Sequence, residues 1–138
     1  MPSLIRYLNT DLDLVSTTEL DAVVRALEAG GVYALHADRR DDGLWHATFE
    51  TQRTYRAAEE NVGAFLAVIE GIAPEVRAVW DGCRVREFNV GYDSGDEPWA
   101  FNQGLCARTL GRMAAAGAGL RVTIYPPDPV EDGGLEGS

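Results

Sequence analysis

The sequence contains no lysine: its 12 basic residues are all arginine, and they face 22 acidic residues. The resulting formal net charge of −10 repels phosphate backbones, whose binding depends on clustered basic side chains. We therefore predict no nucleic-acid partner, and attraction to a basic protein instead. The lack of lysine itself is interpreted as the codon usage of a GC-rich bacterial genome.

Cysteine is scarce, and long apolar runs are missing. Cys83 and Cys106 do not have metal-type spacing, and two cysteines alone do not indicate a disulfide framework. No stretch approaches the roughly 18 apolar residues that span a bilayer, and the N-terminus lacks the basic and apolar regions of a secretory signal. We therefore expect a bacterial cytoplasmic protein without a membrane partner, either a monomer or a homodimer.

The glycine-rich signatures of nucleotide-dependent enzymes and α/β-hydrolases are absent as well. None of G-x-G-x-x-G, G-x-x-x-x-G-K-[ST] and G-x-S-x-G occurs. The H-x-x-x-H, C-x-x-C and EF-hand patterns of common metal sites are also missing. We accordingly predict neither a cofactor nor a metal.

The remaining composition is that of an ordinary globular domain. At 138 residues, with 46% apolar and 25% charged residues, the chain is long enough to bury a stable core. We predict one domain over residues 1–126. Residues 127–138 are rich in proline, glycine and acids and have no apolar periodicity, which predicts a disordered acidic tail.

Hydrophobic periodicity predicts the elements of that domain. Ser16 and Glu19 have capping-box spacing, and the stripe through Leu20 and Leu27 indicates a helix over 16–31. The preceding strand is expected at 4–9, with 10–14 as its exit loop. A hairpin is predicted around "DRRDDG", with Tyr33, Leu35 and Ala37 on one face and His36, His46 and Thr48 on the other. Further helices are expected at 57–72, 74–82 and 107–119, and strands at 83–93 and 120–125.

The order of elements is read as β-α-β-β-α-β-α-β. This order predicts an α+β fold with a ferredoxin-like (split βαβ) antiparallel sheet, extended by a C-terminal αβ unit. Helices would cover one face of the sheet and leave the other open to solvent.

Several segments resemble a bacterial family known as domain of unknown function family 4279. They are "DLDL" before a helix, "GLW" at the start of a strand, "IAPEVRAVW", and the closing "LGRMAAAGAGLRVTIY". The resemblance implies a shared layout up to Tyr125 and carries over no catalytic residue. The stretch "DSGDEPWAFNQGLC" is where this sequence departs most from that layout.

The same stretch holds the candidate site. Its acids could bind a cation or act as general acid and base, and Trp99 could receive a flat ligand. The alternative is a solvated turn whose aromatics, Trp99 and Phe101, fasten it to the core. The candidate binding residues are Asn89, Tyr92, Asp93, Asp96, Glu97, Trp99, Asn102 and Gln103.

Two further candidates are weighed against structural roles. If the hairpin turn centres near Asp41, His36 and His46 lie opposite one another, either as two metal ligands or as a polar pair on a wet face. Cys106 would lie at a helix N-terminus, which favours a thiolate, or belong to a buried stripe with Leu110 and Met113.

These observations favour a non-catalytic module that binds a protein or a small ligand through residues 93–103 and the neighbouring sheet face. One version is an immunity-like or antitoxin-like protein, because acidic surfaces speed the capture of a basic partner. The alternative is a small hydrolase or thiol enzyme, with Asp96 or Glu97 as base and Cys106 as nucleophile.

Overall fold

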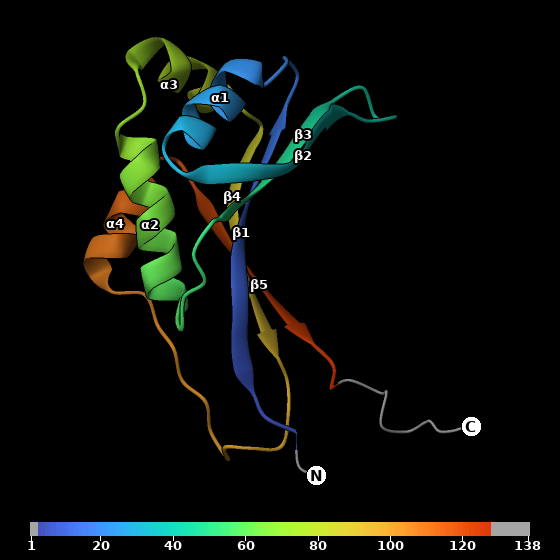
Figure 1. Ribbon diagram of the computed structural model, residues 1–138, viewed down its shortest axis with the longest axis vertical. Helices are drawn as coiled ribbons and strands as arrows, with labels where there is room; N and C mark the ends of the chain where they lie inside the picture. Colours follow the sequence, from blue (N-terminus) through green and yellow to red (C-terminus); the bar gives the residue numbers. More distant parts are fainter. Residues whose placement is uncertain (1–2, 128–138) are drawn as a thin grey trace.

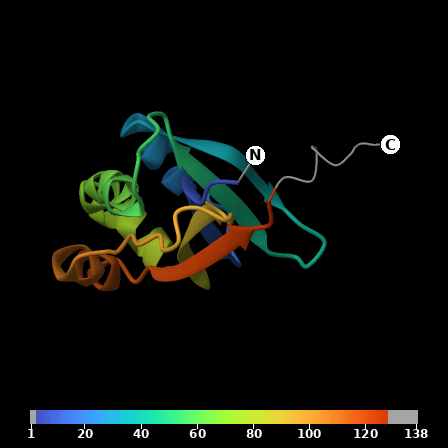
Figure 2. The same cartoon turned by 90° about the horizontal axis from the view of Figure 1, so that it is seen from below.

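The computed structural model describes residues 3–127, which form five strands and four helices. The strands make one sheet in the order β2-β3-β1-β4-β5, and the helices gather on one face of it (Figure 1 and Figure 2). The elements run in the order β1 (Arg6–Ser16), α1 (Asp21–Ala29), β2 (Val32–Arg39), β3 (Trp45–Thr51), α2 (Ala58–Glu70), α3 (Pro74–Asp81), β4 (Val85–Asp93), α4 (Ala107–Ala115) and β5 (Gly119–Tyr125).

The α+β prediction is confirmed, and the sheet is mixed. The pairs β2–β3, β3–β1 and β1–β4 are antiparallel, whereas β4–β5 is parallel. The parallel pair follows from α4, which returns the chain to the end of the sheet where β4 began. Two helices, α2 and α3, connect β3 to β4. The predicted tail, 127–138, lies outside the described residues except for Pro127.

The first strand is longer than predicted. The segment 10–14, expected as an exit loop, belongs to β1 and pairs with both β3 and β4. Leu12 and Leu14 are buried, while Asp11 and Asp13, which alternate with them, lie on the open face of the sheet. The alternation in "TDLDLV" is therefore a strand pattern, in which the acids are tolerated because one face meets water.

The predicted capping box is wrong. Helix α1 begins at Asp21, and its N-cap, Leu20, makes no side-chain cap. Ser16 is instead the last residue of β1, and its hydroxyl accepts the N–H of Thr18 (3.1 Å). Ser16 therefore closes a local turn between strand and helix, a common alternative use of a serine side chain.

The core lies between the sheet and the helices. The predicted apolar stripes of the first two helices are confirmed, since Val23 and Leu27 of α1 and Phe65 of α2 are fully buried. The indole N–H of buried Trp80 donates to the carbonyl of Ala116 (2.8 Å), which ties α3 to the end of α4. The largest buried side chains are Trp80, Phe49, Phe65, Phe88, Leu12, Leu14, Leu27, Leu66 and Ile69.

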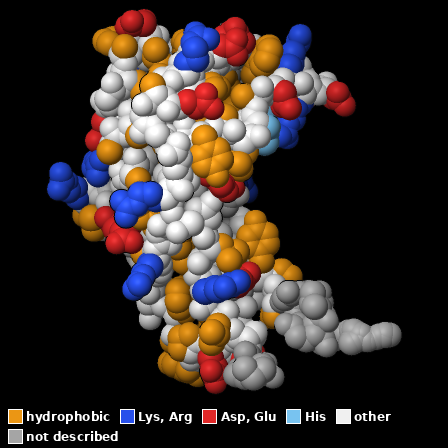
Figure 3. Space-filling view, viewed as in Figure 1, with side chains coloured by type: hydrophobic (Ala, Val, Ile, Leu, Met, Phe, Trp, Pro, Cys, Tyr) orange, Lys and Arg blue, Asp and Glu red, His pale blue; other side chains and the backbone are white. Residues whose placement is uncertain are grey.

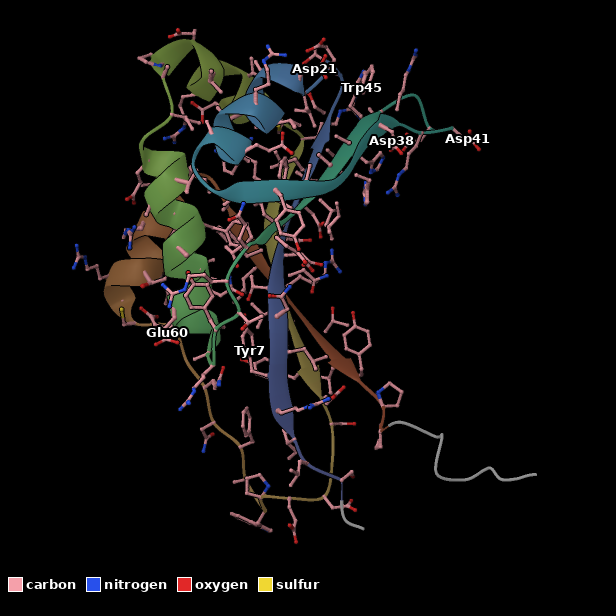
Figure 4. The ribbon with its side chains drawn as sticks, in the orientation of Figure 1. Tyr7, Asp21, Asp38, Asp41, Trp45 and Glu60 are labelled. Carbon is pink, nitrogen blue, oxygen red and sulfur yellow. The ribbon has the colours of Figure 1, made fainter. Side chains whose placement is uncertain are left out.

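A polar network fastens α2 to the sheet. Asn61, fully buried, accepts hydrogen bonds from the Tyr7 hydroxyl (2.7 Å) and the Thr10 N–H (3.1 Å), and donates to Thr51 (3.0 Å). Burial raises the pKa of Tyr7 to about 12. In Figure 4, Tyr7 lies on β1 close to the end of α2 marked by Glu60. The N-terminal end of α2 therefore has a fixed position above β1.

The stripe predicted for the last helix is wrong in part. Thr109 and Met113 are buried, but Leu110 and Cys106 are exposed. Helix α4 packs against α2 and not over β5, so the side of α4 that carries Leu110 has no partner. This arrangement leaves one end of the sheet without a helical cover.

Candidate functional site

The loop 94–106 borders the uncovered part of the sheet. It leaves β4 at the end of the sheet farthest from α1 and α3, then runs back to α4 beside α2 (Figure 1). Hydrophobic side chains gather at this far end on the face seen in Figure 3. The space between this loop and β5 is hollow.

The hollow consists of two adjoining cavities along β5, of about 230 and about 420 Å³. They share Tyr92, Gln103 and Val122, so they form one continuous groove. We call it the β5 groove and define it by Tyr92, Phe101, Leu110, Leu120, Val122 and Ile124. Its walls are apolar, as in most sites that bind other molecules.

The floor of the β5 groove is the helix-side face of β5. The predicted alternation along this strand is confirmed, because Arg121 and Thr123 contact Glu87 and Asn89 on the open face. Leu120, Val122 and Ile124 point the other way and are 45%, 53% and 64% exposed. A row of apolar side chains left this open is a feature of interaction surfaces.

Gln103 fixes the loop wall of the groove. Its side-chain oxygen accepts the N–H of Ala58 at the start of α2 (3.2 Å) and the Tyr92 hydroxyl (3.2 Å). Its amide group donates to the carbonyl of Arg56 (2.9 Å). The N–H of Ala58 has no partner within the helix, and Gln103 supplies one. Gln103 therefore stabilises the start of α2 and also lines the groove.

Only one of the two loop aromatics packs as predicted. Phe101 lies edge-on against Tyr92, with ring centroids 5.9 Å apart. Trp99 is 97% exposed, so it does not fasten the loop to the core. A fully exposed tryptophan is unusual and leaves a large aromatic surface available at the tip of the loop.

The acids of the predicted site have different environments. Asp93 accepts a hydrogen bond from Arg6 (3.0 Å) across the β1–β4 pair. The loop at Asp96 and Glu97 is held through its backbone, since both N–H groups donate to the carbonyl of Ser3 (2.9 and 3.2 Å). Both carboxylates are exposed, and within residues 3–127 neither has an ion-pair partner. They remain available to a basic ligand.

The structure gathers part of the predicted set. Tyr92, Asp93 and Gln103 border the β5 groove. Asn89 lies on the opposite face, where it accepts a hydrogen bond from Thr123 (2.8 Å), and Asn102 is an exposed loop residue. Sequence reasoning missed the groove residues Leu110, Leu120, Val122 and Ile124. Leu120, Val122 and Ile124 share one face of a predicted strand, but alternation alone does not show that this face is open, and Leu110 was predicted to belong to a buried helix stripe.

The open face carries a pair of carboxyl groups that the sequence analysis did not identify. Asp11 of β1 and Glu50 of β3 flank the paired residues Leu12 and Phe49 and line the same cavity on the open face. Glu50 accepts hydrogen bonds from Asn9 (2.9 Å) and Tyr33 (2.8 Å). Burial and the nearby Glu50 raise the pKa of Asp11 to about 7. Among the described carboxyl groups, Asp11 therefore has the largest shift in pKa.

The two histidines share the open face, as predicted, but they are not opposite each other. His36 pairs with Thr48, and His46 pairs with Asp38. The cause is a bulge between Ala34 and His36, which also moves Tyr33 to the open face, contrary to prediction.

The imidazole of His46 instead contacts Asp42 within the hairpin turn (2.9 Å). Among residues 3–127 no three His, Cys, Asp or Glu side chains are grouped closely enough to hold a metal ion.

Cys106 is the N-cap of α4, at the helix start where we predicted it, but it is exposed and not part of the core. Its thiol donates to a carboxylate oxygen of Glu59 (3.3 Å). Hydrogen bonds from Thr109 and from the Cys106 N–H hold the pKa of Glu59 below its usual value. The contacts of the thiol are therefore the Glu59 carboxylate and the Thr109 hydroxyl (3.4 Å).

No known protein family, characterised protein or solved structure matches this chain. The resemblance to domain of unknown function family 4279 therefore stays a prediction. Within the described residues no helix combines the length and the apolar character needed to cross a membrane.

Proposed function

We propose that the protein is a non-catalytic module that binds a basic protein partner, and that the β5 groove receives an apolar, extended segment of that partner. The observation that carries the proposal is the exposure of Leu120, Val122 and Ile124 beside a cavity of about 420 Å³. Soluble domains seldom leave such a row open without a partner.

Burial of the apolar residues of the groove contributes only modestly to the free energy of binding. Full burial of one large aliphatic side chain stabilises a complex by about 1.5 to 3 kcal/mol. Leu120, Val122 and Ile124 are each roughly half-exposed, so covering the three supplies about 3 kcal/mol. That alone corresponds to weak binding, so charge and backbone contacts must contribute the remainder of a specific affinity.

Charge favours a basic partner. The chain carries a net charge of −10, and the exposed Asp96 and Glu97 lie on the loop that borders the groove. Complementary charge raises association rates and fixes the orientation of binding. An immunity-like or antitoxin-like protein that captures a basic toxin is one form of this function. A small apolar ligand in the same groove is the alternative outcome of the test below.

Fold class and location are proposed with it. Strands β1 to β4 follow the order β2-β3-β1-β4, all antiparallel, which supports a ferredoxin-like classification with α3, α4 and β5 as additions. We propose a cytoplasmic protein, in line with two free cysteines, which suit a reducing compartment. A thiol enzyme built on Cys106 is less well supported, since its thiol contacts Glu59 and Thr109 and not a histidine.

The test compares two leucines of similar exposure on the two edge strands. Leu120 on β5 is 45% exposed and Leu35 on β2 is 49% exposed. The wild-type chain is first used to capture its partner from its own host, and that partner is identified and purified. The Kd of the partner is then measured for the wild type, for Leu120→Glu and for Leu35→Glu. We expect Leu120→Glu to weaken binding by at least tenfold, or about 1.4 kcal/mol, and Leu35→Glu to leave it unchanged. Equal affinities, or no protein whose recovery depends on Leu120, would contradict the proposal.

A further inference from the structure

Strand β5 ends the sheet, and within residues 3–127 one of its edges has no partner strand. Its neighbour in the sheet is β4. The N–H of Ser94, just after β4, donates to the carbonyl of Tyr125 (2.9 Å), so the peptide groups of Tyr125 face β4. Successive residues of a strand present their N–H and C=O groups to alternate sides. The backbone groups of Leu120, Val122 and Ile124 therefore point outward along the free edge.

The opposite edge of the sheet has protection that β5 lacks. Strand β2 contains a bulge between Ala34 and His36 and ends in the charged pair Asp38 and Arg39. Bulges and charges are the usual devices that prevent an edge strand from pairing with another chain. In β5 the single charged residue, Arg121, is engaged by Glu87 on β4 (2.8 Å). No bulge interrupts its register with β4.

The same three residues thus offer both kinds of contact. Their side chains form the floor of the β5 groove, and their peptide groups form the free edge beside it. A strand added to this edge would pair with the outward N–H and C=O groups, and every second side chain would turn toward the groove. The cavities of about 230 and about 420 Å³ then lie beside the row of incoming apolar side chains.

We propose that the partner segment binds as a sixth strand on β5, with apolar residues toward the groove alternating with basic residues toward the open face. This inference rests on the proposed function and specifies its mode of recognition. On the open face the added strand would lie beside Arg121, whose charge is paired with Glu87, so the attraction for basic residues comes from the net charge of −10.

A second copy of this chain fits the edge less well. Each copy carries a charge of −10, so two copies repel one another. Charge complementarity therefore favours a basic segment over self-pairing.

The test uses a capped seven-residue peptide in which arginine alternates with isoleucine and valine, titrated into the full chain to about 1 mM. Val122→Pro removes an outward N–H, while the hydrogen bonds to β4 come from the alternate residues and are retained. Val122→Thr is the matched control, because it is also β-branched and keeps the N–H. We expect a Kd below about 1 mM for the wild type, and a Kd for Val122→Pro at least tenfold weaker than that for Val122→Thr, in which the apolar contact is reduced but the N–H is kept.

Amide hydrogen exchange gives the second readout. In the complex, exchange should slow at Leu120, Val122 and Ile124 and stay unchanged at Arg121 and Thr123, which already face β4. A peptide with N-methyl groups on the edge that faces β5 should not bind, because those groups remove its donors.

Three other outcomes would contradict the addition of a strand to β5. If Val122→Pro and the N-methylated peptide bind as well as the originals, the segment occupies the groove without pairing, and the proposed function stands. If no peptide binds by about 1 mM, the inference fails, while the Leu120→Glu comparison with the native partner decides the function separately. If the Leu120, Val122 and Ile124 amides become protected at high protein concentration without peptide, the occupant is a second copy.

Discussion

Replacing Asp11 with asparagine should stabilise the protein above neutral pH and have little effect in acid. Burial and the neighbouring Glu50 raise the pKa of Asp11 from 3.8 to about 7. The folded state therefore holds a proton on Asp11 that the unfolded chain releases between these two values. Its contribution to stability is complete below the unfolded pKa and is lost as the pH rises through the folded pKa.

The size of the effect follows from the shift. Each pKa unit corresponds to 1.36 kcal/mol, so a rise from 3.8 to about 7 sets an upper bound of about 4 kcal/mol at alkaline pH. Asp11 is only half-buried, and solvent screens a group of this kind substantially. We therefore expect Asp11→Asn to gain about 1 to 2 kcal/mol in free energy of unfolding at about pH 8. Near pH 4 an asparagine and a protonated aspartate are nearly equivalent in shape and charge.

Urea denaturation of both chains between about pH 4 and pH 8 measures this difference directly. The matched control is Asp41→Asn, because Asp41 is an exposed acid at the tip of the β2–β3 hairpin (Figure 4). For this control, the free energy of unfolding relative to the wild type should not increase with pH. The reasoning would be refuted by a stability difference between wild type and Asp11→Asn that is constant across the series, or by a loss at pH 8.

Two further predictions concern the loop and the cysteines. Gln103→Ala removes the hydrogen bonds to Ala58, Tyr92 and Arg56, so it should cost about 1 to 2 kcal/mol and raise hydrogen exchange across 94–106. A loop that stays equally protected would show that Phe101 alone positions it. Iodoacetamide should label exposed Cys106 in the folded protein, whereas buried Cys83, whose pKa is raised by burial, should react only after unfolding. Labelling of both at equal rates would contradict the burial of Cys83.

The sequence predicted those elements whose signals are local. The stripe through Val62 and Phe65 and the proline at the start of α3 act within one or two turns, and both helices form where predicted. The start of α1 was missed because Ser16 can either cap a helix or close a turn, and the choice depends on how far β1 extends. The bulge between Ala34 and His36 changes which face each hairpin residue meets, and no local signal specifies it.

The candidate site was predicted only where it involves the loop. Tyr92, Asp93 and Gln103 border it, but Asp96, Glu97 and Trp99, which drew attention by composition, have exposed side chains. Alternating apolar residues in β5 look the same whether a helix covers them or not. Their exposure is decided by α4, which packs against α2 and leaves β5 open. The exposure of β5 therefore depends on how the helices pack and cannot be predicted from the sequence of the strand alone.

An open apolar edge creates a risk of self-association, and the net charge of this chain counters it. Edge strands usually carry local protection, which β2 has and β5 lacks. A charge of −10 repels other copies over a Debye length of about 8 Å at physiological salt, while it attracts a basic segment. The strong acidity and the unprotected edge of β5 therefore act together. The same negative charge disfavours pairing between copies and favours a basic segment that can add a strand to the sheet.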